Sequence, residues 1–70
     1  MNLTYYIIRG RGPGGQKFQL AKLEDESGND FKGQYDMARH FESIDELKSY
    51  IAKDVVKQDE ASITLSAMNI

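Results

Sequence analysis

The sequence predicts a small α+β domain in which a four-stranded, mostly antiparallel sheet carries one helix on one face. Leu3 to Arg9 is apolar or aromatic on both alternating sets of positions, which is typical of a strand in the middle of a sheet. Ser43 to Lys57 repeats apolar residues at spacings of three and four, as an amphipathic helix does. Ser62 to Ile70 alternates apolar and polar residues, which indicates a half-buried strand.

Length and composition predict a single domain over residues 1–70. The chain is 40% apolar and contains no cysteine, so disulfides, thiolate metal sites and cysteine nucleophiles are excluded. Its longest apolar run, Tyr5 to Ile8, is far shorter than the roughly twenty residues that span a bilayer, and no leader pattern precedes it. We therefore expect a cytoplasmic protein with no membrane partner.

The second strand is predicted from its context. Gly10 to Gly15 contains four of the six glycines and the only proline, which predicts a chain reversal. The next segment, Gln16 to Glu24, is composed of residues that favour a helix, but its position after a glycine-rich loop favours a hairpin. We interpret it as a strand with a bulge near Ala21, and a helix remains the alternative.

A third strand is predicted over Phe31 to Phe41, after a turn at Ser27 to Asp30. Tyr35, Met37 and Phe41 occupy alternate positions, and Gly33 fits a bulge. The register of this strand is left open.

The helix is predicted to begin at Ser43, because Ser43 and Glu46 form a capping box. The helix should end near Lys57, and its apolar stripe contains Ile44, Leu47, Ile51 and Val55. The element order is then β-β-β-α-β. A crossover through the helix places the fourth strand parallel to the first, in spatial order 4-1-2-3.

One helix covers only one face of a sheet, so the other face must be polar, dimerise or bind a partner. The chain has seven aromatic residues, more than one helix can cover. We expect Tyr6 and Tyr35 on the open face or its rim, where tyrosine is a common interface anchor.

The net charge of −2 conceals a strong asymmetry. Residues 1–23 carry four basic side chains and no acid, whereas residues 24–70 carry five basic and eleven acidic side chains. Charge asymmetry of this kind is typical of proteins with a charged partner. The acidic candidates for binding are Glu24, Asp25, Glu26, Asp30, Glu42, Asp45 and Glu46.

No motif in the sequence predicts catalysis. Gly10 to Gly15 matches the pattern G-x-G-x-x-G, but a dinucleotide site needs a helix at the third glycine within a larger βαβ unit. His40 is the only histidine, and without cysteine it does not make a typical zinc site. We therefore expect no enzyme activity, no catalytic residue, no metal and no cofactor.

The basic end of the chain supports an alternative function. Arg9, Arg11 and Lys17 flank the glycine-rich hairpin tip, and three cations at one tip suit salt-sensitive contact with nucleic-acid phosphates. The alternative is therefore a small nucleic-acid-binding module.

The segment from Ala38 to Tyr50, ARHFESIDELKSY, resembles the strand-to-helix junction of small phage-encoded inhibitors, namely anti-CRISPR proteins and phage inhibitors of host RNA polymerase. The resemblance implies a short acidic domain that blocks a host complex from within the host cytoplasm. It also implies that the acids at the helix entry, or those of the turn at residues 24–30, face basic residues of the target.

The leading hypothesis is therefore a non-catalytic protein-binding module, an inhibitor of phage or mobile-element origin that binds by charge complementarity and through one exposed sheet face. Its partner is a host protein or nucleoprotein complex. A homodimer formed through sheet faces or edges is a third possibility.

Overall fold

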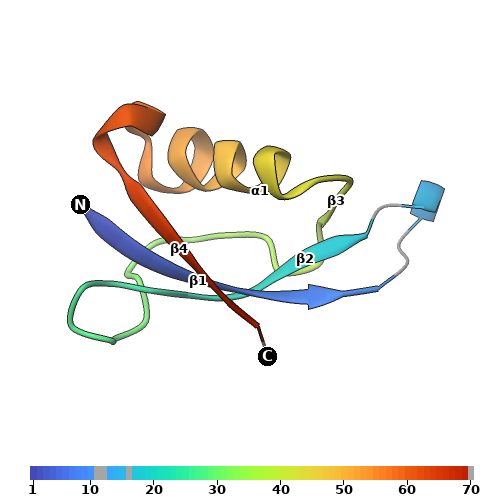
Figure 1. Cartoon of the computed structure of the whole chain (residues 1–70), viewed down its shortest axis with the longest axis horizontal. Helices are drawn as coiled ribbons and strands as arrows, with labels where there is room; N and C mark the ends of the chain where they lie inside the picture. The colour runs from blue at the N-terminus through green and yellow to red at the C-terminus, as the bar shows by residue number, and fades with distance from the viewer. Residues whose placement is uncertain (11–12, 16, 70) are drawn as a thin grey trace.

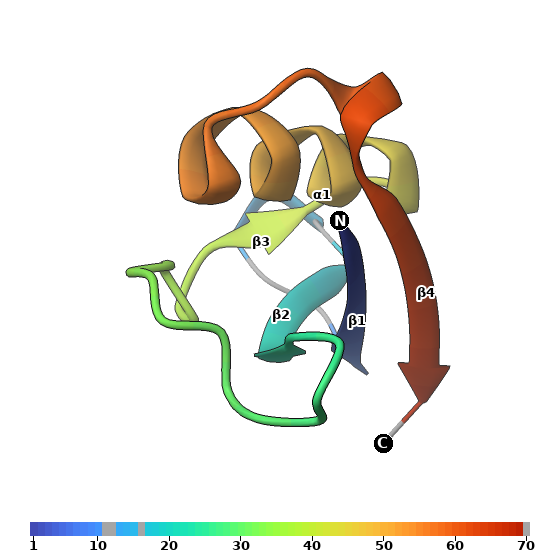
Figure 2. The same cartoon turned by 90° about the vertical axis from the view of Figure 1, so that its left-hand side faces the viewer.

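Four strands form one mixed sheet with a helical layer on one side (Figures 1 and 2). The computed structural model describes residues 1–10, 13–15 and 17–69. In spatial order β3-β2-β1-β4, the strands are His40–Phe41, Phe18–Glu24, Asn2–Arg9 and Thr64–Asn69. This is the predicted order read from the opposite edge, so the predicted fold class is confirmed.

The central strand β1 pairs on both sides. It is antiparallel to β2 and parallel to β4, and its two-sided apolar pattern matches that position. Opposite β1, the β2 partners shift from Lys22 to Leu20, which leaves Ala21 as the extra residue of a bulge. The strand interpretation of β2 and its predicted bulge are both confirmed.

The glycine-rich segment connects β1 to β2 as a hairpin. The Gly10 N–H donates to the Lys17 carbonyl oxygen at 2.9 Å, and Pro13–Gly15 forms a short 3-10 turn, η1. Residues 11, 12 and 16 lie outside the described part of the chain. Since a strand follows the glycines, the G-x-G-x-x-G pattern lacks the helix that a dinucleotide site needs.

The predicted third strand over Phe31 to Phe41 is wrong for most of its length, because only His40–Phe41 forms β3. The Phe31 N–H still donates to the Leu23 carbonyl oxygen at 2.8 Å. The Gly33 N–H then donates back to the Phe31 carbonyl oxygen at 2.9 Å, in a turn that takes the chain away from β2. A Cβ at Gly33 would lie 2.6 Å from the Phe31 ring, so Gly33 permits a tight turn and not the predicted bulge.

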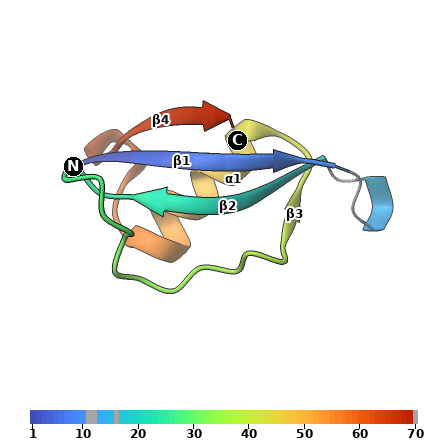
Figure 3. The ribbon, with the colours of Figure 1, turned by 90° about the horizontal axis from the view of Figure 1, so that it is seen from below.

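The segment between β2 and β3 runs alongside β2 (Figure 3). Two tyrosine hydroxyls hold it there, one to β2 and one to the helix. The Tyr35 hydroxyl accepts from the Leu23 N–H at 3.2 Å, and the Tyr50 hydroxyl accepts from the Asp36 N–H at 2.9 Å. The segment therefore satisfies part of the β2 edge that the short β3 does not reach.

The helical layer consists of α1, Ile44–Tyr50, continued by a π-helical segment, η2, Ile51–Val56. Ser43 Oγ accepts from the Glu46 N–H at 3.1 Å, as predicted. The Glu46 carboxylate accepts from the Glu42 N–H at 3.2 Å, one residue before the amide that a capping box engages. The layer ends at Lys57, which is left-handed with φ 64°, so the predicted end is confirmed.

The core lies between the helical layer and one face of the sheet. The buried side chains alternate along β1 and repeat at helical spacing, as predicted, and Phe41 is wholly buried from β3. A short 3-10 turn, η3, Glu60–Ser62, leads into β4, which begins two residues later than the predicted Ser62. The buried residues are Leu3, Tyr5, Ile7, Leu20, Leu23, Phe41, Leu47, Ile51, Ala52, Val55 and Ile63.

Replacing the helix cap tests this local structure. Ser43→Ala removes the acceptor for the Glu46 N–H and should lower the free energy of unfolding by about 1 kcal/mol. Ser43→Asp keeps an acceptor and should stay close to the wild type. Urea denaturation followed by circular dichroism measures both, and equal stability of the alanine variant and the wild type would contradict a role for the cap.

Candidate functional site

The face of the sheet opposite the helical layer is the candidate site. Even-numbered residues of β1 point to this face because the odd-numbered Leu3, Tyr5 and Ile7 are buried under the helix. Viewed from below, the strands lie in front of the helix (Figure 3). Strand register places the following side chains on this open face: Thr4, Tyr6, Ile8, Gln19, Lys22, Glu24, Ser66 and Met68.

An apolar and aromatic cluster occupies β1 and β4 on this face. Ile8 is 48% exposed and Met68 is 49% exposed, although both are large apolar residues. Met68 is the β4 neighbour of Tyr6, and Ile8 follows Tyr6 on the same face of β1. We call Tyr6, Ile8 and Met68 the open-face patch. Adjacent apolar residues exposed in this way are typical of binding surfaces.

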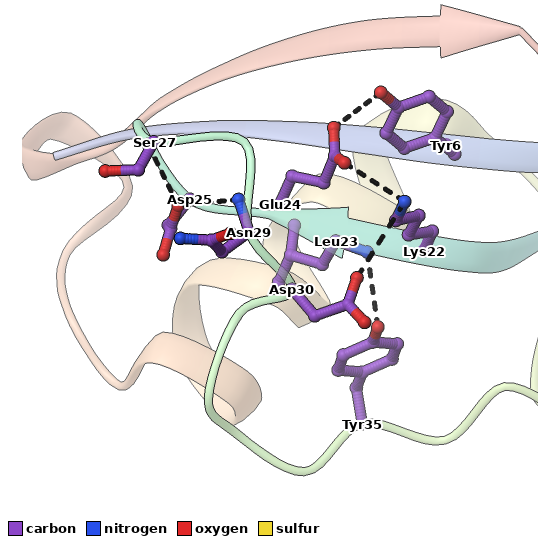
Figure 4. Close-up of polar contacts among 9 residues, drawn as sticks. All are labelled: Tyr6, Lys22, Leu23, Glu24, Asp25, Ser27, Asn29, Asp30 and Tyr35. Atoms are coloured by element: carbon purple, nitrogen blue, oxygen red, sulfur yellow. Dashed lines mark hydrogen bonds and ion pairs between the residues drawn. The ribbon is translucent and has the colours of Figure 1, made fainter.

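Polar contacts from β2 fix the ring of Tyr6 (Figure 4). The Tyr6 hydroxyl donates to Glu24 Oε1 at 2.5 Å, and Lys22 Nζ lies 3.1 Å from Glu24 Oε2. Lys22 Nζ also lies 5.6 Å from the centroid of the Tyr6 ring, within the range of a cation–π contact. Tyr6 is thus oriented before any partner arrives, which lowers the entropy cost of binding.

The same contacts shift two pKa values in opposite directions. The hydrogen bond from Tyr6, and then that from Lys22, lowers the pKa of the Glu24 carboxyl. The hydrogen bond to Glu24, aided by burial, raises the pKa of the Tyr6 hydroxyl. Contact with Glu24 likewise raises the pKa of Lys22. At neutral pH the group therefore holds a carboxylate, an ammonium and a protonated phenol.

Most of the predicted acidic residues are engaged within the chain. Glu24 holds Tyr6 and Lys22, and Asp30 lies 3.9 Å from Lys22. Asp25 Oδ1 accepts from the Ser27 and Asn29 N–H groups, which fixes the predicted turn. The remaining engaged acids are Glu26, which accepts from the Asn2 N–H, and Glu46.

The structure does not bring the two acidic groups together. Glu24 pairs with Thr4 near the start of β1 and leads into the acidic turn. Glu42, Asp45 and Glu46 follow β3, whose Phe41 pairs with Phe18 beside Arg9 at the end of β1. The two groups therefore lie at opposite ends of the central strand.

The described cations of the alternative site lie together, but they share their end of the sheet with acids. Arg9 and Lys17 flank the closed base of the hairpin, and the Arg9 guanidinium lies 5.3 Å from the centroid of the Phe18 ring. Arg11 lies outside the described residues. Because the helix entry with Glu42 and Asp45 is at the same end of β1, the surface there is of mixed charge.

Tyr6 lies on the open face, whereas Tyr35 is half-buried at the β2 edge, where its hydroxyl accepts from Leu23. Ile8 and Met68 were not among the predicted site residues. The sequence did contain a pattern that could have indicated them. In a strand, Ile8 lies on the same face as Tyr6, and Met68 lies on the same face as Thr64 and Ser66.

Comparison with protein-family models, with curated proteins and with solved structures found no match to this chain. No helix in the described part of the chain has the length and apolar character needed to cross a bilayer. Residues 1–10, 13–15 and 17–69 contain no group of three side chains arranged to hold a metal ion.

The link between Tyr6 and Glu24 is testable by titration. Because the pKa of Glu24 is lowered in the folded protein, ionised Glu24 stabilises the fold at pH values above the ordinary carboxyl pKa. This contribution is lost as the pH falls through the lowered pKa. Tyr6→Phe removes the first cause of the shift, so the Glu24 pKa should rise toward its ordinary value. Carbon-13 NMR titration of the carboxyl measures this change.

Tyr35→Phe is the matched control, because it removes a tyrosine hydroxyl that bonds Leu23 and not Glu24. The Glu24 pKa should not change in this variant. A Glu24 pKa that is the same in Tyr6→Phe and the wild type would show that the hydrogen bond does not hold the carboxylate.

Proposed function

We propose that this protein is a non-catalytic module that binds another protein through the open-face patch. The observation that carries the proposal is the exposure of Ile8 and Met68 next to a fixed tyrosine, on the sheet face without a helical cover. An oriented tyrosine beside large apolar side chains has the composition of an interface core.

The polar groups beside the patch suit a protein partner whose own apolar patch is bordered by polar residues. The charge of the Glu24 carboxylate next to Tyr6 is offset by Lys22, so neither group of this ion pair enters the interface as an unpaired charge. Burying the open-face patch is favourable by about 25 cal/mol for each Å² of apolar surface removed from water. A partner with a complementary apolar patch gains this energy without leaving a charge unpaired.

The open-face patch supports the proposal better than the acidic residues do. Five of the seven predicted acids already hold hydrogen bonds or ion pairs within the chain. Glu42 and Asp45, at the helix entry, are the acids that we propose as auxiliary contacts. In the setting that the resemblance to phage inhibitors implies, the partner we propose is a host protein complex.

Affinity capture tests the proposal. Immobilised wild-type protein should retain a protein from bacterial lysate at a 1:1 ratio in moderate salt. The double variant Ile8→Ser/Met68→Ser should lower the affinity for that protein at least about tenfold, because it removes the apolar centre of the interface.

Met37→Ser is the matched control, since Met37 is 55% exposed but belongs to the segment before β3, where its carbonyl oxygen accepts from Gln19 of β2, and not to β1 or β4. It should bind as the wild type does. Failure to retain any protein, or equal binding by the double variant, would refute the proposal. Retention of nucleic acid that disappears with salt would favour the alternative nucleic-acid-binding module led by Arg9, Arg11 and Lys17.

A further inference from the structure

The two edges of the sheet are treated differently. On one side, the segment between β2 and β3 satisfies the β2 edge through Tyr35 and Phe31, and β3 is only two residues long. At the other edge of the sheet, β4 is the outermost strand, and it pairs with β1 alone among the described strands. Figure 2 shows β4 at the border of the sheet, and none of the described residues forms a strand beyond it.

β4 also lacks the features by which proteins protect an edge strand from pairing. Such edges usually carry charged residues, proline or a bulge. Thr64–Asn69 contains no charged residue and no proline, and its register with β1 runs without a shift. β4 therefore presents a regular row of backbone donors and acceptors to a further strand.

The residues around Leu65 form a pattern that is symmetric in polarity. Leu65 and Ala67 of β4 are apolar and lie on the helix side, whereas Thr64 and Ser66 carry hydroxyls and face the open side. Ile63 precedes β4 in an extended conformation and is buried in the core on the helix side. In an antiparallel pair of β4 strands centred on Leu65, Ile63 lies opposite Ala67, and Thr64 lies opposite Ser66. Apolar side chains then meet apolar ones, and hydroxyls meet hydroxyls, which are favourable cross-strand pairs.

A cleft beside this edge fits the same arrangement. It has a volume of about 200 Å³ and lies between the helical layer and β4, where Ala52, Ile63 and Leu65 form an apolar lining. Lys48 and Glu60 complete the lining with opposite charges. A leucine on the helix side of an added strand, opposite Leu65, would lie next to this lining.

We propose that β4 pairs antiparallel with β4 of a second copy of this chain, about a twofold axis at Leu65. The two sheets join into one sheet of eight strands, and Leu65 of each copy lies beside the cleft of the other. A twofold interface requires a self-complementary surface, and the sequence ITLSA at residues 63–67 meets that requirement.

The dimer does not depend on the proposed function, but it would change how the open-face patches are presented to a partner. Both helical layers lie on one side of the joined sheet, and both open-face patches lie on the other. A dimer would therefore present two patches on one surface and bind a repeated or twofold partner with increased avidity.

Sedimentation equilibrium over a range of concentrations tests the dimer and its register. The wild type should fit a monomer–dimer equilibrium. Thr64→Lys/Ser66→Lys places two like-charge pairs across the twofold axis and should raise the dimer dissociation constant at least about tenfold.

The matched control is Thr64→Lys/Ser66→Glu, which changes the same two exposed positions but places opposite charges across the axis. Its dissociation constant should stay within about threefold of the wild-type value. Only a register that pairs residue 64 with residue 66 predicts this difference, and circular dichroism checks that both variants fold.

Amide hydrogen exchange of the wild type gives a test without any variant. Exchange in β4 should slow as the protein concentration rises, while exchange in the segment before β3 should not change. Three results would overturn the proposal. The wild type could be monomeric at all concentrations, or the two variants could have equal dissociation constants. The dimer could also be broken by Ile8→Ser/Met68→Ser but not by Thr64→Lys/Ser66→Lys. Dimerisation without a captured protein would refute only the proposed function, and capture by a monomer would refute only this inference.

Discussion

The structure depends on β1, which pairs on both sides and carries apolar side chains on both faces. Leu3, Tyr5 and Ile7 pack under the helical layer and form the sheet side of the hydrophobic core in this chain of 70 residues. The same strand then necessarily places Tyr6 and Ile8 on the opposite face, because successive side chains alternate. The core and the open-face patch are thus two consequences of one strand with a single helical cover.

The elements with strong local signals could be predicted from the sequence. The helix has both a capping serine and an apolar stripe, so its beginning at Ser43 and its end near Lys57 follow from local chemistry. β1 and β4 have patterns that specify their positions in the sheet, and the crossover rule then orients β4. For the site, two-sided apolarity and a single helix predicted an open face with Tyr6 on it.

The remaining features depend on contacts between residues distant in the chain. The alternation of Tyr35, Met37 and Phe41 resembled a strand, but the turn closed by the hydrogen bond from the Gly33 N–H to the Phe31 carbonyl oxygen takes the chain away from β2. The hydroxyls of Tyr35 and Tyr50 then replace strand hydrogen bonds, and no local pattern indicates such partners. The acids were grouped by sequence as a charged surface, whereas most of them hold turns, caps or Tyr6.

The central claim is that one face of β1 is buried and the other is open for binding. NMR relaxation of methyl groups in dilute protein with a soluble paramagnetic agent tests it directly. The methyls of Ile8 and Met68 should relax much faster than those of Ile7 and Ile51, which are 4% and 0% exposed. Equal protection of all four residues would mean that the face is covered, and it would contradict this account of the fold and of its binding surface.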